Sequence, residues 1–323
     1  IITLAIDEIN QNGGIEGKNI ELVVEDGKCA SQDAVTATRK LINIDKIRFI
    51  LGGHCSPETI AMVPIVDDAQ VFLLAGVTAA DDAVSASKYA FRTTPATLEI
   101  SKETSRIAYD KYGYKKIAMI TEGAAFSKSF TDDIKKTYKG EIVSEQTYVP
   151  GETDFRSILT KINKDGIDAL LISPQTPTAA VLILNQMEEF DLLDIPMFGS
   201  TIFVSSNVNS NSGGLLPESA FAVSAFADPT TDKSQELQNN YKETYGGAVP
   251  YNLYYVGAAY DGVYMLRDAL ELCGEDVDCV QKYFDELEGY EGASGVFSFK
   301  ENGDPMFDSW KEMRIVDGKA ILE

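Results

Sequence analysis

The stretch "GGHCSPETIAMVPIVDDAQVFLLAGVTAA", residues 52–80, decides the fold that this sequence predicts. It begins at the end of a short apolar run, "FILGG" (49–53), continues through a helical segment at 56–69 and ends in a second apolar run at 71–77. Short, continuous apolar runs are typical of parallel strands that are covered on both faces. A strand, a helix and a second strand in this order predict a right-handed βαβ unit.

The same alternation extends along the chain. Further strands are predicted at 19–26, 116–123, 141–150, 167–174 and 196–201, and further helices at 31–44, 100–113, 127–140, 155–165 and 176–191. Repeated units of this kind predict an α/β protein with open, doubly wound, parallel-rich sheets. The chain has 323 residues, enough for two such lobes, with a crossing between them near 92–97.

The turns that follow the predicted strands are the candidate binding positions, because ligands of doubly wound sheets bind at the carboxyl ends of the strands. These turns are rich in small and hydroxyl-bearing residues: Ser56, Gly76, Thr78, Ser127, Ser173, Gln175, Thr176, Ser200 and Thr201. None of them matches a phosphate-binding P-loop or a GxGxxG turn, so no nucleotide cofactor is predicted.

The strongly acidic composition argues against two classes of binding partner. The formal net charge is −22 and the sequence pI is near 4.4, which argues against binding to nucleic acid or to an anionic membrane surface. No apolar run reaches the roughly 20 residues that a membrane-spanning helix needs. The first residues, "IITLAIDEINQNGG", already form an amphipathic helical pattern, and we expect a signal peptide to lie outside this sequence.

Four cysteines occur, at positions 29, 55, 273 and 279. An even number in an acidic chain fits an exported protein with two disulfides. Zinc is the competing interpretation, but the sequence has one histidine and no CxxC motif, so no metal site is predicted.

The triplet His54-Cys55-Ser56 raises the question of catalysis. Adjacent residues in an extended segment point to opposite sides, so His54 is poorly placed to activate Cys55, and no second histidine or GxSxG motif is present. Ser56 is predicted to cap a helix over 57–69, with Pro57 at its first position. The free N–H groups of a helix start also suit a carboxylate, and Thr78 can add a second hydroxyl, so capping and ligand binding both remain open.

At this point the residues resemble a known family. The segments "AIDEINQNGGIEGKNIELVVEDGKC", "FILGGHCSPET", "VFLLAGVTAADDA", "YAFRTTPA" and "YVGAAYDGVYMLRDALELCG" resemble type I periplasmic binding proteins of the leucine/isoleucine/valine-binding kind, which are the substrate-binding subunits of ABC transporters. The resemblance covers essentially the whole chain. It implies a non-enzymatic solute-binding protein, periplasmic or lipid-anchored outside the cell, which captures a small ligand by hinge closure and delivers it to a membrane permease.

The resemblance also implies a domain organisation. Two Rossmann-like lobes, joined by three crossovers, are expected to comprise 1–94 with 225–297 and 95–224 with 298–323, and the family's first strand of lobe 1 is expected ahead of Ile1, outside this sequence. The ligand is expected in the cleft between the lobes. Disulfides are expected between Cys29 and Cys55 and between Cys273 and Cys279, which would make Cys55 a structural residue beside the ligand loop.

The family pattern assigns the candidate ligand-binding residues. Ser56 and the turn Gly76-Val77-Thr78 are expected to hold a ligand carboxylate. Phe126 matches the stacking aromatic residue at the start of a lobe 2 helix, Gln175 lies in the turn after "ALLIS", and Tyr255 offers an apolar wall. For both aromatic residues, ordinary core packing remains the alternative.

One departure concerns Thr201. Amino-acid binders of this family place a glutamate after "FG" in lobe 2, where it pairs with the ligand ammonium, whereas this sequence has Ser200 and Thr201. An unpaired ammonium in a closed cleft would be costly. Either another acid such as Glu122 replaces the glutamate, or the ligand lacks an amine.

The sequence therefore leaves several alternative functions open. A branched-chain or other amino acid is the first expected ligand, and an amine-free aromatic or small carboxylate or an amide is the alternative. The same fold also serves as the ligand-sensing domain of receptors. A hydrolase using Cys55 or Ser56 is the enzymatic alternative.

Overall fold

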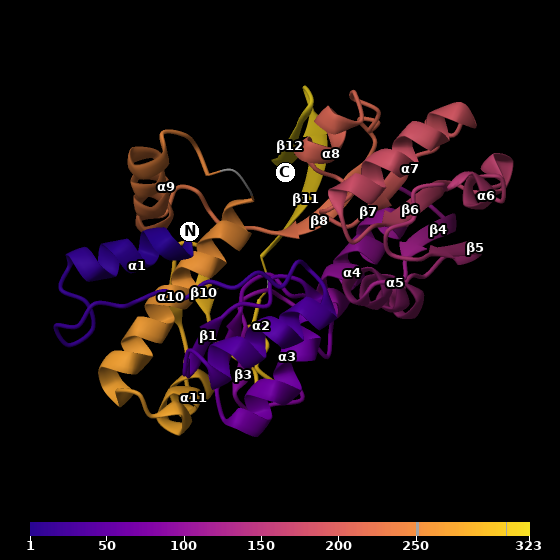
Figure 1. The fold of residues 1–323 in the computed structure, drawn as a ribbon. Helices are drawn as coiled ribbons and strands as arrows, with labels where there is room; N and C mark the ends of the chain where they lie inside the picture. The colour runs from indigo at the N-terminus through magenta and orange to yellow at the C-terminus, as the bar shows by residue number, and fades with distance from the viewer. Residues whose placement is uncertain (250–251, 308) are drawn as a thin grey trace. The chain divides into compact units, whose positions relative to one another are not determined.

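The computed structural model describes residues 1–249, 252–307 and 309–323, which form two compact units (Figure 1). Unit 1 comprises Ile1–Ala96 and Phe226–Ser309, and unit 2 comprises Thr97–Ala225 and Trp310–Glu323. The chain therefore passes three times from one unit to the other. The first two passages lie one or two residues from the expected boundaries at 94 and 224.

The third passage lies later than expected. We expected residue 298 and its successors in lobe 2, but the chain stays in unit 1 up to Ser309. Two contacts hold this segment there: the backbone N–H of Arg92 donates to the carbonyl of Gly303 at 3.0 Å, and the Phe299 ring packs edge-on against Phe91 at 5.5 Å. The boundary expected at 297 is thus corrected to 309. Contacts with the distant residues Phe91 and Arg92 keep the segment 298–309 in unit 1, and its own sequence does not indicate to which unit it belongs.

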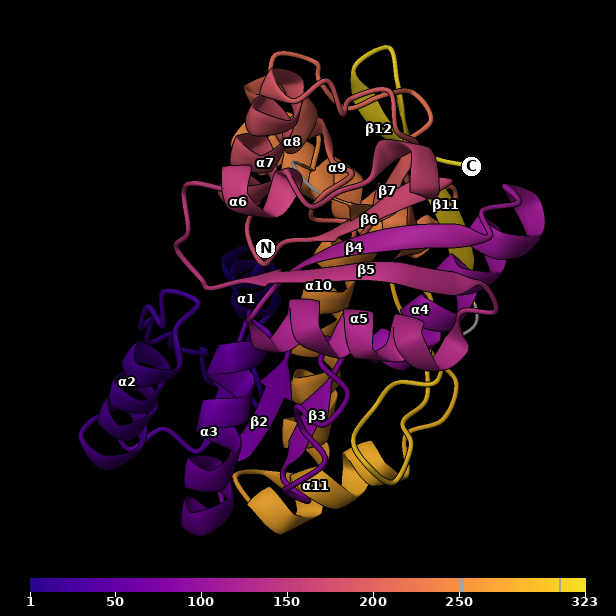
Figure 2. The same ribbon diagram turned by 90° about the vertical axis from the view of Figure 1, so that its right-hand side faces the viewer.

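Unit 2 is built on a sheet that has seven strands in the described part of the chain, in the order β12-β11-β8-β7-β6-β4-β5 (Figure 2). The strands from β5 to β8 pair in parallel, and β8, β11 and β12 pair antiparallel. The strand that follows β4 in sequence, β5, lies on one side of it, whereas β6 and β7 lie on its other side. This reversal of strand order creates a topological switch point at the carboxyl edge of the sheet. The strands are β4 Lys116–Glu122, β5 Glu141–Tyr148, β6 Ala169–Ser173, β7 Met197–Gly199, β8 Phe221–Ala225, β11 Trp310–Val316 and β12 Lys319–Leu322.

Helices cover both faces of this sheet. Ile117 and Met119 pack with α4 (Thr97–Arg106), its π-helical continuation Ile107–Lys111 and α5 (Ala125–Thr137). Ala118 and Ile120 point to the other face and pack with α6 (Arg156–Leu159), α7 (Pro177–Glu189) and α8 (Ser206–Asn211). The inner parallel strands β4, β6 and β7 are therefore buried on both sides, which explains their continuous apolar sequences, whereas the edge strand β5 exposes alternate residues. This arrangement confirms the predicted α/β class.

The helix predicted at 155–165 is wrong in its length. Only Arg156–Leu159 is α-helical, and a 3₁₀ turn follows at Lys164–Gly166. The N–H groups of Lys161 and Ile162 donate to carbonyls three residues back, so the segment tightens into turns after one helical turn.

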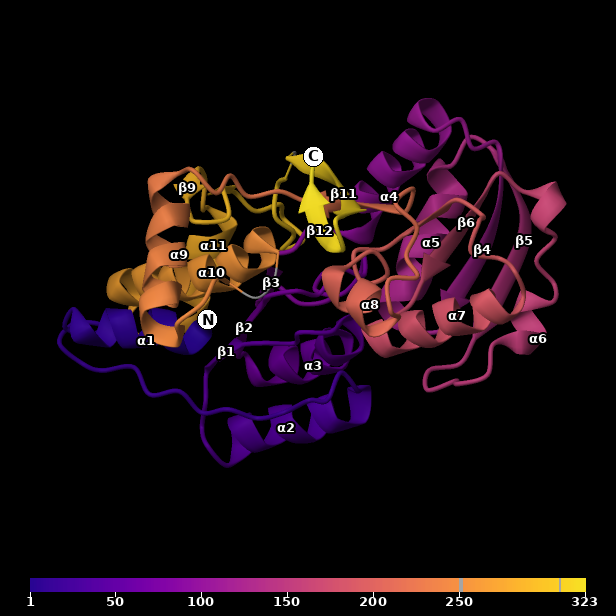
Figure 3. The same cartoon turned by 90° about the horizontal axis from the view of Figure 1, so that it is seen from above.

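Unit 1 contains a parallel sheet of β1 (Phe49–Leu51), β2 (Phe72–Ala75) and β3 (Ala90–Arg92). Helices α2 (Ser31–Asn43) and α3 (Ser56–Ala69) lie side by side against one face (Figure 3). Helix α1 (Ile2–Gln11) packs along α10 (Leu253–Cys273) (Figure 1). The remaining elements of this unit are α9 (Asp232–Tyr245), α11 (Val277–Asp285), β9 (Tyr290–Glu291) and β10 (Val296–Phe297).

The strand predicted at 19–26 does not form. Residues 21–25 make no backbone hydrogen bond to any described residue, and Val24 is 74% exposed. A cavity of about 890 Å³, lined by this segment, by β1 and by apolar residues of α1, α2 and α10, separates the segment from the free edge of β1. The apolar sequence favours a strand, but a strand also needs a hydrogen-bonding neighbour, and none lies beside it here.

Among the described residues, no helix is both long enough and apolar enough to cross a membrane.

Candidate functional site

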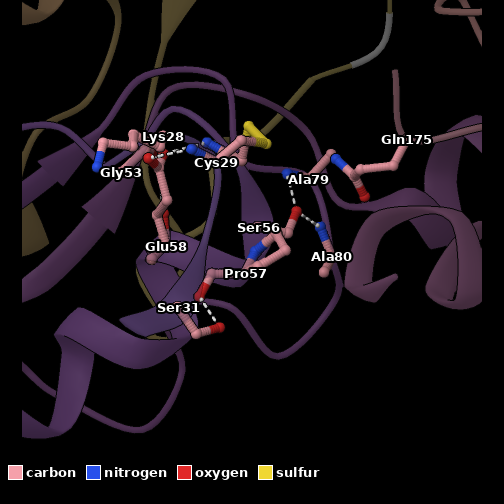
Figure 4. The surroundings of a disulfide bond; sticks show 12 residues. Lys28, Cys29, Ser31, Gly53, Ser56, Pro57, Glu58, Ala79, Ala80 and Gln175 are labelled. Atoms are coloured by element: carbon pink, nitrogen blue, oxygen red, sulfur yellow. Dashed lines mark hydrogen bonds between the residues drawn. A yellow bond between two sulfur atoms is a disulfide. The ribbon is translucent and has the colours of Figure 1, made fainter. Parts of the chain in front are cut away.

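The candidate site in unit 1 begins at a disulfide (Figure 4). Cys29 and Cys55 are bonded, and Cys273 and Cys279 form a second bond, so both predicted pairs are confirmed. The Glu58 carboxylate accepts a hydrogen bond from the backbone N–H of Cys29 at 2.9 Å and another from that of Cys55 at 2.8 Å. The disulfide and this carboxylate together join the loop before α2 to the start of α3. No thiol is left on Cys55 to act as a nucleophile.

Ser56 does not cap the helix, contrary to the prediction. Helix α3 begins at Ser56 itself, and the cap position belongs to Cys55. The buried Ser56 Oγ instead accepts hydrogen bonds from the backbone N–H groups of Ala79 at 3.3 Å and Ala80 at 3.1 Å (Figure 4). Its acceptor capacity is used by the turn, but its own proton remains available for donation. His54, in contrast, is exposed to solvent.

The turn bonded by Ser56 carries the second candidate hydroxyl. Thr78 is completely buried, and its Oγ1 has no hydrogen-bond partner in the part of the chain that the structure describes. Gly76 and Val77 are half-buried just before it, and the Gly76 carbonyl accepts from the hydroxyl of Thr93 at 3.1 Å. A buried hydroxyl without a partner is uncommon, and it marks a position where a ligand or water can bond. The structure thus brings Ser56, Gly76, Val77 and Thr78 together at one turn.

A buried ion pair, which sequence analysis missed, holds this turn in place. Arg92 is fully buried, and its Nε donates to Asp304 at 2.7 Å. Its Nη1 donates to the carbonyl of Ala80 at 2.6 Å, and its Nη2 donates to that of Asp81 at 3.2 Å. Burial lowers the pKa of Arg92 and the charge of Asp304 opposes that shift. The two partners are 212 residues apart, and no local pattern indicates the pair.

Tyr255 lies near the start of α10. The Asn252 side chain caps this helix by accepting from the Tyr254 N–H at 2.9 Å, and the two residues before Asn252 lie outside the described part of the chain. Tyr255 is buried, with its ring edge-on to Tyr254 at 5.5 Å. This packing is equally compatible with a core residue and with a wall of the site.

In unit 2, Glu122 ends β4 and is almost completely buried. Its Oε2 accepts hydrogen bonds from the backbone N–H of Gln175 at 2.8 Å and from the Tyr148 hydroxyl at 3.1 Å. Burial raises the pKa of Tyr148, and the negative charge of Glu122 raises it further, so the tyrosine stays protonated and donates. Glu122 therefore positions the turn that carries Gln175, and the side-chain Oε1 of Gln175 has no partner within the described ranges.

The other predicted residues of unit 2 also lie at the carboxyl edge of its sheet. Phe126 is the second residue of α5, half-buried and stacked on Phe130 at 6.3 Å. Thr201 is half-buried in the turn after β7, and Ser200 beside it is buried. Sequence analysis places Ser127 and Ser173 only among the turn residues of this edge and not among the ligand-binding residues. Both are fully buried, and neither hydroxyl has a partner among the described residues.

No group of histidine, cysteine, aspartate or glutamate in the described ranges is arranged to hold a metal ion. The chemistry that the described site residues offer is therefore that of hydroxyls, backbone N–H groups and one engaged carboxylate. These groups can bind and orient a small polar molecule.

The family model described as "Periplasmic binding protein" matches residues 2–319 of the chain. The "Leucine-, isoleucine-, valine-, threonine-, and alanine-binding protein" of Pseudomonas aeruginosa is 24% identical over 306 residues, which cover 93% of this chain and 80% of that protein.

Solved structures show the same fold. The branched-chain amino acid transporter substrate-binding protein LivJ from Streptococcus pneumoniae, in complex with isoleucine, superposes with a TM-score of 0.89 at 26% identity, covering 100% of this chain and 92% of that one. An ABC transporter solute-binding protein from R. palustris, in complex with benzoate, gives 0.84 at 21% identity, covering 99% and 89%. Proteins of this fold thus hold both an amino acid and an amine-free carboxylate.

Proposed function

The chain belongs to the periplasmic binding protein family, and from this premise we propose that it captures a small carboxylate-bearing solute and delivers it to the membrane permease of an ABC importer. The names of its relatives support this proposal, since they describe binding of branched-chain amino acids and substrate binding for transporters.

The arrangement of Ser56 and Thr78 is the observation that carries the proposal. The turn from Thr78 to Ala80 is fixed by the Ser56 Oγ and by the buried guanidinium of Arg92. Neither the Ser56 proton nor the Thr78 hydroxyl has an acceptor among the described residues. One hydroxyl on the turn and a second one bonded to that turn from the start of α3 can each donate to an oxygen of a carboxylate. Because their geometry is preformed, binding costs little ordering of side chains.

We propose that residues of unit 2 complete the site. Phe126 offers an aromatic face, Gln175 offers an amide, and Thr201 offers a hydroxyl. A ligand that bonds to both units favours the closed state, because it gains contacts that the open state lacks. Tyr255 and the Gly76-Val77 backbone are proposed to line the unit 1 side.

The proposed setting is extracytoplasmic, either periplasmic or lipid-anchored outside the cell. Two disulfides support it, because such bonds persist in oxidising compartments. We propose binding without catalysis: Cys55 is held in a disulfide, and His54 is exposed at the end of a strand.

Calorimetric titration of the purified chain with amino acids, aromatic acids, small carboxylates and amides tests the proposal. At least one carboxylate-bearing compound is expected to bind with micromolar affinity or better, and Ser56→Ala is expected to weaken it. Binding restricted to compounds without a carboxylate would contradict the role given to Ser56 and Thr78.

A further inference from the structure

Three serine hydroxyls in unit 2 are buried without a partner. Ser127 and Ser173 are fully buried and Ser200 is 2% exposed, and none of their Oγ atoms makes a hydrogen bond in the described structure. Leaving a buried hydroxyl unbonded costs free energy, so three on one sheet edge are best explained by a partner that arrives from outside the chain.

The three hydroxyls share one face of the sheet. Side chains alternate along a strand, so Ser173 lies on the same face as Leu171, and Ser200 on the same face as Phe198. Both Leu171 and Phe198 pack with α5, the helix whose first turn carries Ser127. The pairing of Ile172 with Gly199 places Ser173 beside Ser200 in the next register position.

Glu122 lies on the opposite face. Its neighbour Ile120, two positions earlier, and its hydrogen-bond partner Tyr148 both belong to the cluster that packs with α7. Two donors already occupy its Oε2, and both come from within unit 2. Glu122 is thus fixed as the partner of the Gln175 turn, on the face away from the three serines.

The turns that carry these hydroxyls contain no acid of their own. The turns 123–127, 174–177 and 200–205, which follow β4, β6 and β7, contain no charged residue. Glu152, after the edge strand β5, accepts from the backbone N–H groups of Thr153 and Asp154, and these bonds lower its pKa.

We infer that Ser127, Ser173 and Ser200 select a ligand whose second polar group is uncharged, so that the ligand is a small carboxylic acid bearing a hydroxyl, carbonyl or amide in place of a protonated amine. This inference rests on the proposed function, which supplies the carboxylate contact in unit 1. A neutral polar group of the ligand can donate hydrogen bonds to the serine hydroxyls or accept hydrogen bonds from them. An ammonium buried there would lose its hydration without gaining a countercharge.

Matched ligands test the inference. Calorimetry on the full chain uses branched-chain, aromatic and short-chain skeletons, each supplied as the amino acid, the 2-hydroxy acid and the deamino acid; examples are leucine with 2-hydroxyisocaproate, and phenylalanine with phenyllactate. For the skeleton that binds best, the hydroxy acid is expected to bind at least tenfold more tightly than the amino acid. An amino acid that binds as tightly or more tightly overturns the inference and leaves the proposed function standing. No binding by any form overturns both.

Variants separate recognition from folding. Ser173→Ala and Ser200→Ala are expected to weaken the hydroxy acid at least fivefold with little change for the deamino acid, whereas the exposed Ser157→Ala is a control with no effect on either. Thr201→Glu, at a half-buried position that can accept a carboxylate, is expected to shift the preference toward the amino acid. Equal losses for all three ligand forms in the serine variants would show a purely structural role and contradict the inference.

Discussion

The side-chain oxygen of Ser56 accepts a hydrogen bond from the backbone N–H of Ala80 at 3.1 Å, across 24 residues of sequence. This bond joins the first residue of α3 to the turn after β2, which are the two segments expected to meet at the carboxyl edge of the sheet. The bond also restrains the orientation of the serine hydroxyl. A hydroxyl that accepts a hydrogen bond keeps its own proton, so Ser56 can still donate to a ligand.

Replacing Ser56 by alanine is expected to weaken ligand binding by roughly 10- to 100-fold, since a hydrogen bond to a charged group contributes about 1.5–3 kcal/mol. Calorimetry with the tightest ligand measures the change. The exposed Ser85→Ala in the same unit is the matched control and is expected to bind as the parent does. Unchanged affinity in the Ser56 variant would remove this residue from the site.

The two disulfides are expected to differ in their contribution to stability. Loop-closure entropy grows with the number of residues enclosed, so removing Cys29–Cys55, with a separation of 26, should cost about 3.5 kcal/mol, and removing Cys273–Cys279, with a separation of 6, about 2 kcal/mol. Urea unfolding of the two Cys→Ala double variants measures both values. A larger loss from the shorter loop would show that native contacts, rather than chain entropy, decide the order.

Sequence reasoning succeeded where one local signal decides the outcome. The apolar runs at 49–53, 71–77 and 167–174 predicted parallel strands, and parallel strands form within them at Phe49–Leu51, Phe72–Ala75 and Ala169–Ser173, because short continuous apolar runs are typical of such strands. The residues at strand ends, such as Thr78 and Gln175, followed from the rule that parallel strands present their carboxyl ends to one edge.

It failed where the outcome depends on a distant partner. Residues 19–26 have the composition of a strand, but no described strand lies beside them, and residues 21–25 form no backbone pair with a described residue. Ser56 has the composition of a cap, but the turn at Ala79–Ala80 competes for its oxygen. The ion pair of Arg92 with Asp304 depends on the path of the chain between them, which no local pattern encodes.

Removing one partner of the Arg92–Asp304 pair is expected to be severe. Arg92→Met leaves the carboxylate of Asp304 buried without its cation and releases the Ala80 carbonyl, which should cost about 3–5 kcal/mol. Thermal and urea unfolding measure the loss. The double variant Arg92→Met/Asp304→Leu is expected to recover part of it, because no isolated charge remains. A single variant as stable as the parent would contradict the role of the pair.

The acid stability of unit 2 should depend on Asp168. Its carboxylate accepts from the backbone N–H groups of Lys115 and Lys116, and these bonds lower its pKa. Because the folded pKa lies below the unfolded one, the stabilisation is present above the unfolded pKa and is lost as the pH falls through the folded pKa. Asp168→Asn is therefore expected to lose stability at neutral pH and to match the parent in strong acid. A difference that stays constant across the pH range would refute this assignment.

A strand added ahead of Ile1 is expected to fill the cavity beside β1. Ile1 lines that cavity, and an extended segment there would face two unpaired backbone edges, that of Phe49–Leu51 and that of residues 21–25. Joining about six alternating β-branched residues to Ile1 should therefore give new parallel hydrogen bonds on both sides and bury apolar surface.

The expected result is a melting temperature several degrees higher, together with slower amide exchange at residues 21–25. A Gly/Ser extension of the same length is the control and should change neither, because it offers no side chains to the apolar lining. If the β-branched extension raised the melting temperature without protecting these amides, the added residues would be packing elsewhere. The cavity would then not be a strand position.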